Sequence, residues 1–300
     1  MMLRSYDSME QAVKACFGDD VNIIKQSYVG GGDINDSSRL QLSNGEQAFI
    51  KSNTLDNKGF FDAEETGLYA IKKTGTIQTP RLICKGMDRI QGCSFLMMEM
   101  ITPAGKVRDF WETFGHELAA MHKSDTGAFV TGGKFGFYAD NYIGASKQIN
   151  SPKDTWISFF RELRLEPQFK MASAYFDKDT ARLMLRLLDK LDDILVEPEN
   201  PSLLHGDLWS GNYIVGNDGK AWLIDPAAYV GHAEADLAMT ELFGRFDQRF
   251  YDSYNETNPL QPDYRDRKDL YNLYHMLNHL NLFGRMYYSS VTSIIRRYAG

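Results

Sequence analysis

Three polar residues in the second half of the chain have the types and spacing that phosphoryl transfer requires. Asp207 and Asn212 share one loop, and Asp225 ends the hydrophobic run 222–224. A carboxylate such as Asp207 can orient an attacking hydroxyl group and accept its proton. An amide oxygen and a carboxylate, here Asn212 and Asp225, are hard ligands that can share a magnesium ion with phosphates and water. The pattern therefore predicts one catalytic base and two metal ligands.

The surrounding loop supports this interpretation. His205, Asp207 and Asn212 stand at the offsets of the protein-kinase catalytic loop H-R-D-L-x-x-x-N. The alternative is a turn rich in Asp, Gly and Asn whose side chains only cap backbone groups. That alternative does not account for the apolar pair Leu203-Leu204 before the loop, nor for the second aspartate after the next run. We therefore favour phosphoryl transfer from ATP with Mg2+.

Candidate nucleotide-binding residues precede this loop. The triplet Gly30, Gly31 and Gly32 separates two strand-like runs, and glycines let backbone N–H groups approach phosphate oxygens. A plain hairpin turn is the alternative for the triplet. Lys51 ends the run Ala-Phe-Ile-Lys as the phosphate-holding lysine does in V-A-I-K, although an exposed lysine at a strand end would look the same.

The following helical pattern, residues 60–72, adds Glu64, which could pair with Lys51, whereas we expect its neighbours Asp62 and Glu65 to be solvated. The run 95–101 could then offer the backbone edges of Glu99, Met100 and Ile101 to adenine. Most of its methionines are otherwise ordinary core residues.

The periodicity predicts two unlike halves. Short strand-like runs dominate up to residue 101, at 23–29, 37–42, 47–51, 81–85 and 95–101. Amphipathic helices dominate afterwards, at 109–122, 156–165, 179–196 and much of 263–298, with short strands at 202–205 and 221–224. We therefore predict an α+β, bilobal protein-kinase-like fold. Its N-lobe, residues 1–101, holds a small antiparallel sheet with one helix, and its C-lobe, residues 102–300, is larger and mostly helical.

Composition excludes several function classes. The net charge of −7 over 300 residues does not attract nucleic acid or an anionic membrane. Three cysteines without a C-x-x-C pair argue against a disulfide framework or a zinc knuckle. The N-terminus has no apolar signal region, and no window is long enough to span a membrane. We expect a soluble, cytoplasmic protein that binds neither nucleic acid nor membrane, with a monomer slightly favoured.

Other polar residues have structural alternatives. His275 and His279 stand four apart on a helix, but the glutamate of a zinc-binding H-E-x-x-H motif is absent, so we expect them in the interior or on a surface between the lobes. Glu234 and Asp236 could bind substrate or support the catalytic loop, and support is the preferred interpretation. Glu234 is kept as a substrate-binding candidate.

Longer motifs extend almost from end to end. They are Gly30–Asn35, Phe61–Glu64, Phe135–Phe137, Asp140–Gly144, Phe159–Leu165, His205–Asn212, Asp225–Ala227, Gly231–Phe243 and Leu273–His279. With these motifs the chain resembles the fructosamine kinase, or ketosamine-3-kinase, family, a branch of the kinase-like fold that also includes aminoglycoside and choline kinases. Asp-Leu-Trp-Ser-Gly-Asn at 207–212 and Asp-Leu-Ala-Met-Thr-Glu-Leu-Phe at 236–243 are the parts specific to this branch.

The resemblance implies a substrate. It would be a sugar joined to an amine as a ketoamine, such as a fructosyl, ribulosyl or erythrulosyl adduct of lysine, on a small molecule or a protein. Phosphorylation of its 3-hydroxyl group would destabilise the adduct and free the amine, which is deglycation, a form of protein repair. Trp209 would face the sugar. Two alternatives stay open: a kinase for another small hydroxyl compound, of the aminoglycoside or choline kinase type, and an inactive nucleotide-binding module.

Two positions depart from the family pattern. Asp33 stands where many members have a cysteine after the glycine triplet, so redox control through that loop is not expected. Arg245 stands where a glycine is frequent, which would put a cation near the substrate.

Overall fold

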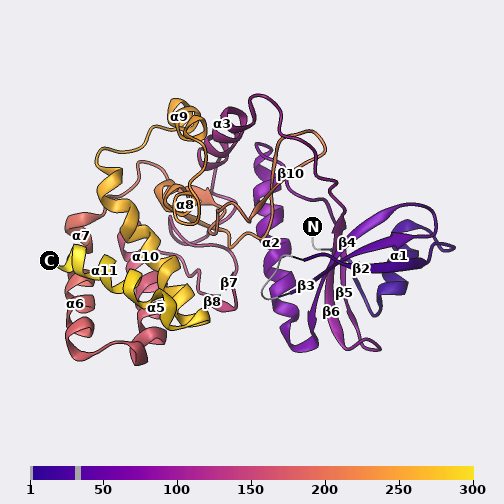
Figure 1. The fold of residues 1–300 in the computed structure, drawn as a ribbon, viewed down its shortest axis with the longest axis horizontal. Coiled ribbons are helices and arrows are strands. Elements are labelled where there is room, and N and C mark those ends of the chain that lie inside the picture. The colour runs from indigo at the N-terminus through magenta and orange to yellow at the C-terminus, as the bar shows by residue number, and fades with distance from the viewer. Residues whose placement is uncertain (1–2, 31–34) are drawn as a thin grey trace.

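The computed structural model describes residues 3–30 and 35–300, and it has two lobes (Figure 1). The N-lobe holds a six-stranded sheet in the order β1-β5-β6-β4-β3-β2. Its elements are β1 (Ser5–Tyr6), α1 (Met9–Phe17), β2 (Ile23–Tyr28), β3 (Asp36–Leu42), β4 (Gln47–Thr54), η1 (Leu55–Asn57), α2 (Lys58–Thr74), β5 (Leu82–Asp88) and β6 (Cys93–Glu99). The α+β, protein-kinase-like architecture predicted from the sequence is therefore present.

Two features of the N-lobe differ from the prediction. Strand β1 pairs with β5 in parallel, so the sheet is mixed rather than purely antiparallel. Helix α1 is a second helix, whose buried residues Met9, Ala12 and Val13 join the core formed by the sheet. Both elements are short, and a two-residue strand has too few positions to show an alternating pattern.

Helix α2 stands between the sheet and the rest of the molecule (Figure 1). Gly67 lets it approach the C-lobe closely, because a Cβ atom there would lie 2.9 Å from Pro226 Cγ. The rings of Phe60 and Tyr142 stack with their centroids 4.1 Å apart, which ties the start of the helix to β7. The helix that carries Glu64 is thus held against the segment that follows Asp225.

The C-lobe is mostly helical. Its elements are α3 (Phe110–His122), β7 (Asn141–Ile143), β8 (Ser146–Gln148), α4 (Trp156–Phe160), the π-helical turn η2 (Arg161–Leu165), α5 (Glu166–Met171), η3 (Ala172–Tyr175), α6 (Lys178–Asp189), α7 (Leu191–Ile194), β9 (Ser202–Leu204), β10 (Tyr213–Val215), β11 (Ala221–Leu223), β12 (Tyr229–Gly231), α8 (Ala233–Thr240), α9 (Gln248–Thr257), α10 (Tyr264–Phe283), η4 (Arg285–Tyr287) and α11 (Tyr288–Ala299).

The long helical pattern at the C-terminus is interrupted once. Gly284 adopts a φ of +85°, which residues with a side chain rarely adopt, so α10 ends there and α11 begins after η4. The pattern over 179–196 is likewise divided, into α6 and α7. Hydrophobic periodicity reports which face of a segment is buried, and it continues across such breaks.

Two short antiparallel strand pairs position the loop 205–212. Strand β9 pairs with β12, and β10 pairs with β11. The loop that joins β9 to β10 therefore starts from a buried strand and returns into a hairpin, at whose end Asp225 lies. Leu203 and Leu204 of β9 are fully buried, which fixes the start of the loop in the core.

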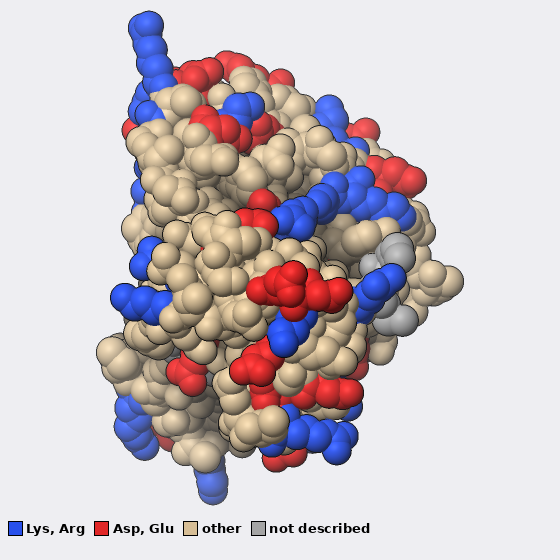
Figure 2. Space-filling model, turned by 90° about the vertical axis from the view of Figure 1, so that its right-hand side faces the viewer, with Lys and Arg blue, Asp and Glu red and all other residues tan. Residues whose placement is uncertain are grey.

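The surface carries both signs of charge. On the face shown in Figure 2, acidic and basic side chains are interspersed and neither forms a continuous patch. Within the described residues, no helix has the length and apolar character that crossing a bilayer requires.

Candidate active site

The loop between β9 and β10 turns sharply at a glycine. Gly206 has a φ of +83°, and a Cβ atom there would lie 2.1 Å from the carbonyl oxygen of Ala227. Only glycine fits this position without moving the backbone. The loop is thereby pressed against the segment after Asp225, and the two predicted parts of the site become neighbours.

Asp236 of α8 binds the backbone of the same loop. Its two carboxylate oxygens accept hydrogen bonds from the backbone nitrogens of His205, at 2.7 Å, and Gly206, at 2.8 Å. His122 Nε2 lies 3.2 Å from Asp236 Oδ2. Burial would raise the pKa of Asp236, but its interactions with His122 and His205 and the hydrogen bond from the Gly206 backbone lower it overall. Asp236 is therefore a buried carboxylate that supports the loop, which was the preferred interpretation of the sequence.

Asp207 is oriented by Asn212. The amide nitrogen of Asn212 donates to the Asp207 backbone oxygen at 2.8 Å and to its Oδ2 at 3.0 Å. Burial raises the pKa of Asp207 to about 7, and the hydrogen bond from Asn212 opposes this shift only in part. A carboxylate with such a pKa is suited to accepting a proton near neutral pH.

Lys51, Glu64 and Asp225 meet between the lobes. Lys51 Nζ lies 2.6 Å from Glu64 Oε1, which is the pairing predicted from the sequence, and it also forms an ion pair with Asp225. Burial would lower the pKa of Lys51, but the two carboxylates raise it, so the ammonium group stays charged. Burial would also raise the pKa of Asp225, but Lys51 lowers it overall, so Asp225 stays a carboxylate.

The predicted metal ligands lie next to each other. The backbone oxygen of Asn212 accepts from the nitrogen of Ile224, the residue before Asp225, at 3.1 Å. Asn212 uses its amide nitrogen for Asp207, which leaves its amide oxygen for a cation. Among the described residues, no group of three or more His, Cys, Asp or Glu side chains could hold a metal by itself. One carboxylate and one amide oxygen nevertheless suit Mg2+, which usually keeps phosphate and water ligands as well.

The nucleotide candidates are only partly described. Gly30 follows β2 and has open space around it, whereas Gly31, Gly32 and the departure at Asp33 lie outside the described residues. Glu99 ends β6, and its Oε1 accepts from the Arg81 nitrogen at 2.5 Å. The half-buried Met100 and Ile101 follow it towards the C-lobe. Adenine contacts at these three residues stay a prediction, and so does a lobe boundary after residue 101.

Aromatic rings extend from the catalytic loop on the acceptor side. Trp209 is half-buried and meets Phe243 edge to face, with the ring centroids 6.1 Å apart. The ring centroids of Phe243 and His279 of α10 are 4.8 Å apart. Gly211 makes room for the indole, because a Cβ atom there would lie 2.5 Å from it. The position of Trp209, two residues from Asp207, is compatible with the predicted contact to a sugar.

Arg245 makes local contacts on the surface. Its guanidinium lies over the Tyr251 ring, 4.2 Å from the centroid, and bonds to Gln248 at 2.8 Å. Glu241 lies 3.4 Å away, so part of the added charge is balanced locally.

Two sequence interpretations need correction. Glu234, kept as a substrate candidate, is 1% exposed, and both its oxygens accept from Arg267, at 3.0 and 2.6 Å. A carboxylate enclosed in this way has no free face for a substrate, so we remove it from the site. Glu65, expected in solvent, is buried and pairs with Lys85 at 2.7 Å, while Asp62 remains exposed. Helical periodicity did not show that a cation from β5 would reach Glu65.

Two contacts of the site were not predicted from the sequence: that of His122 with Asp236, which supports the loop, and that of His275 with Asp207. His275 Nδ1 lies 3.9 Å from Asp207 Oδ1. Local patterns could not have revealed either contact, because His122 and Asp236 are 114 residues apart in the chain and His275 lies 68 residues after Asp207.

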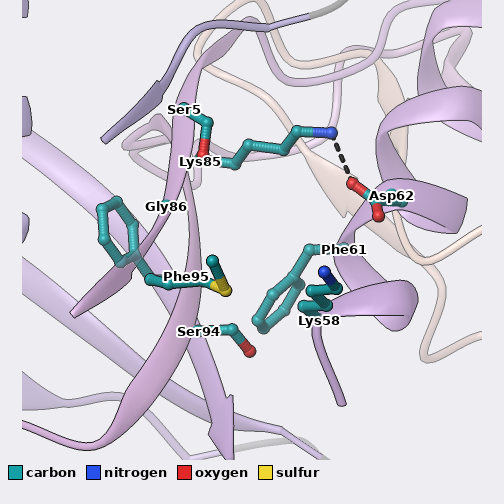
Figure 3. A pocket seen from close by; sticks show the side chains of 9 residues that line it. Ser5, Lys58, Phe61, Asp62, Lys85, Gly86, Ser94 and Phe95 are labelled. Carbon is teal, nitrogen blue, oxygen red and sulfur yellow. Dashed lines mark hydrogen bonds and ion pairs between the residues drawn. The ribbon is translucent and has the colours of Figure 1, made fainter. Parts of the chain in front are cut away.

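A separate pocket of about 160 Å3 opens on the N-lobe between α2, β5 and β6 (Figure 3). Lys85 points across it to Asp62, and Phe61 and Phe95 form its apolar part. None of the residues predicted to contact nucleotide, metal or acceptor lines this pocket, so it is distinct from the candidate active site.

Comparison with known proteins gives one consistent family. The family model described as fructosamine kinase matches residues 5–299. A Synechocystis protein named as a ketoamine kinase is 38% identical over 97% of this chain and 96% of its own. The chloroplastic protein-ribulosamine 3-kinase of Arabidopsis thaliana is 39% identical over 94% of this chain and 84% of its own.

Solved structures agree with this result. A Haemophilus somnus protein named as a fructosamine-3-kinase superposes with a TM-score of 0.85 at 28% identity, covering 97% of this chain and 96% of its own. A choline kinase from Streptococcus pneumoniae, with a TM-score of 0.60 at 14% identity over 97% of each chain, shares the fold alone.

Proposed function

Because the chain belongs to the fructosamine kinase family, we propose that it transfers the γ-phosphoryl group of ATP to the 3-hydroxyl group of a ketoamine sugar. The names of its relatives support this substrate class, since they include ketoamine kinases and ribulosamine 3-kinases. The phosphorylated adduct would then break down and release the amine, so that the reaction serves deglycation.

The ion pair between Lys51 and Asp225 is the observation that carries the proposal. It brings Lys51, inside β4, to the segment that also contacts Asn212, although the two residues are 174 positions apart in the chain. A lysine, a carboxylate and an amide converge there beside Asp207, and this is the set of groups that phosphoryl transfer uses.

In the proposed reaction, the oxygen of the 3-hydroxyl group attacks the γ-phosphorus, and Asp207 accepts the proton of that hydroxyl group. The bond between that phosphorus and the bridging oxygen of ADP breaks, and the negative charge leaves with ADP. Asn212 keeps the carboxylate of Asp207 in place. Lys51, fixed by Glu64, would bind the phosphates. Asp225 and Asn212 would hold Mg2+, which neutralises charge on the phosphates when bound.

The test is ADP release in a panel of acceptors. Ribulosyl-lysine, fructosyl-lysine and erythrulosyl-lysine would be compared with choline and an aminoglycoside, with the Asp207→Asn variant as the control for background ATP hydrolysis. We expect turnover with at least one ketoamine and none with the other two compounds. Turnover only with choline or the aminoglycoside would refute the ketoamine assignment, and activity with none of them would favour an inactive module.

A further inference from the structure

His275 of α10 is a buried histidine with one ring nitrogen that lacks a partner. Its side chain is 6% exposed, and Nδ1 has no hydrogen bond to any described residue. Burial lowers the pKa of His275 to about 3, so the imidazole is neutral near pH 7. A polar atom enclosed without a partner is unfavourable, and its retention calls for a reason.

The other buried histidines in the described part of the chain behave differently. His122 bonds Tyr254 through Nδ1 at 2.7 Å and approaches Asp236 through Nε2. His205 bonds Ile224 through Nε2 at 2.8 Å and receives a backbone N–H at Nδ1. His232 likewise uses both nitrogens. The unpartnered Nδ1 of His275 is therefore specific to this site and not a general feature of the core.

One carboxylate oxygen of Asp207 also lacks a hydrogen-bond partner. Its Oδ2 accepts from Asn212, but its Oδ1 has no hydrogen-bond donor among the described residues, and this is the oxygen that lies 3.9 Å from His275 Nδ1. The separation exceeds a hydrogen bond by about 1 Å, which a small side-chain rotation would close. Nδ1 has almost no solvent-accessible surface, so bulk water does not reach it as the side chains lie.

We propose that His275 is a positioning residue for the catalytic base: when the acceptor is bound, its Nδ1–H donates to Oδ1 of Asp207. With Asn212 on Oδ2 and His275 on Oδ1, the carboxylate can no longer rotate about its Cβ–Cγ bond. Each oxygen keeps a further lone pair, and one of these faces the hydroxyl group. A neutral donor orients the carboxylate without cancelling its charge. A lysine at this place would cancel it. This inference rests on the proposed function, since it concerns the same base.

The test uses three substitutions that separate hydrogen bonding from packing. In His275→Asn, the side-chain amide nitrogen lies close to where Nδ1 was, whereas in His275→Gln it lies nearer to the place of Nε2. His275→Leu fills much of the volume and donates nothing. Steady-state kcat and KM would be measured for each with the best ketoamine and with Mg-ATP. Tyr271→Phe, one turn away on α10 and directed at Trp156 and Phe160, is the matched control.

We expect His275→Leu and His275→Gln to lower kcat about 10- to 100-fold, with both KM values within about 3-fold of wild type. His275→Asn should stay within about 3-fold in kcat, and Tyr271→Phe should match wild type. A purely structural role predicts another order, in which leucine is tolerated best and asparagine worst. That order, or a leucine variant as active as wild type, would overturn the proposal.

A variant that does not fold and a wild-type protein without ketoamine activity lead to different conclusions. If the leucine variant does not fold, as judged by circular dichroism and Mg-ATP binding, the contrast between asparagine and glutamine still decides the question. Wild-type protein that releases ADP with no ketoamine would refute the proposed function, and the role of His275 would fall with it. Wild-type turnover combined with unaffected variants refutes only the role of His275.

Discussion

Asp207 and Asp225 are two aspartates of the same site whose pKa values shift in opposite directions. Burial raises the pKa of Asp207 to about 7, because the nearest group that stabilises its charge is the neutral amide of Asn212. Asp225 is also affected by burial, but the ammonium group of Lys51 more than compensates and lowers its pKa. Lys51, which reaches across from β4, is the main cause of the difference.

The opposite pKa shifts of Asp207 and Asp225 suit two different roles, a base and a metal ligand. A base must be able to take up a proton, whereas a metal ligand must stay charged, and environments that move two carboxyl groups apart are a common way to assign such roles. Asp225 also has a φ of +56°, a strained backbone conformation for a residue with a side chain. The surroundings therefore hold Asp225 in a costly geometry, which fits a carboxylate with a fixed position.

The substitution Asp207→Asn should have the largest effect, and it tests whether Asp207 and Asp225 have different roles. If Asp207 is the base, kcat should fall by about 1,000-fold or more, because the amide cannot accept the hydroxyl proton. The affinity for Mg-ATP should change by less than about 3-fold, since the side chain acts on the acceptor. Turnover assays and calorimetric titration with Mg-ATP check both values. Wild-type turnover in this variant would remove Asp207 from the mechanism.

Asp225→Asn should have the next largest effect, of another kind. Loss of the carboxylate should weaken Mg-ATP binding roughly 100-fold, the scale expected for one charged group in such a site. Binding of ATP in the presence of EDTA should change much less. Titrations with and without Mg2+ make the distinction. Equal losses under both conditions would mean that Asp225 acts on Lys51 and not on the metal.

Asp236→Asn extends the comparison to a carboxylate that supports the loop without touching substrate. The amide keeps one acceptor oxygen, so one of the two backbone N–H groups that Asp236 binds loses its partner. We expect the free energy of unfolding to fall by about 1–3 kcal/mol. In urea denaturation Asp207→Asn should be close to wild type, because Asn212 can still bond an amide oxygen there. A stability loss that is larger for Asp207→Asn would reverse this assignment.

Gly67→Ala should have the smallest effect. The added methyl group would press on Pro226, next to Asp225, and displace α2 together with Glu64. Overpacking costs about 1–3 kcal/mol, but alanine regains about 1 kcal/mol in a helix. We therefore expect a slightly lower Tm and a rise of a few fold in the KM for ATP. Gly105→Ala, where a Cβ atom would meet open space, is the control and should leave both unchanged.

The sequence by itself determined which groups are candidates for the chemistry and which kinds of element carry them. The spacing of His205, Asp207 and Asn212, and the aspartate after the next hydrophobic run, are local properties of the chain. The alternation from strand to helix periods is also local, so the protein-kinase-like fold could be predicted. The strand β1 could not, because two residues are too few to show a period. Helix α1 does have helical spacing, with Met9, Ala12 and Val13 buried on one face, but it was not predicted from the sequence.

Only the tertiary structure decided which charges meet. Glu64 and Glu65 are adjacent glutamates on one helix, yet one pairs with Lys51 of β4 and the other with Lys85 of β5. Glu234 and Asp236 are likewise close in sequence, but Arg267 takes the first and the catalytic loop the second. Electrostatic and hydrogen-bonding partners are set by distance in space, and a one-dimensional pattern does not contain that distance. The approach of His275 to Asp207 has the same origin.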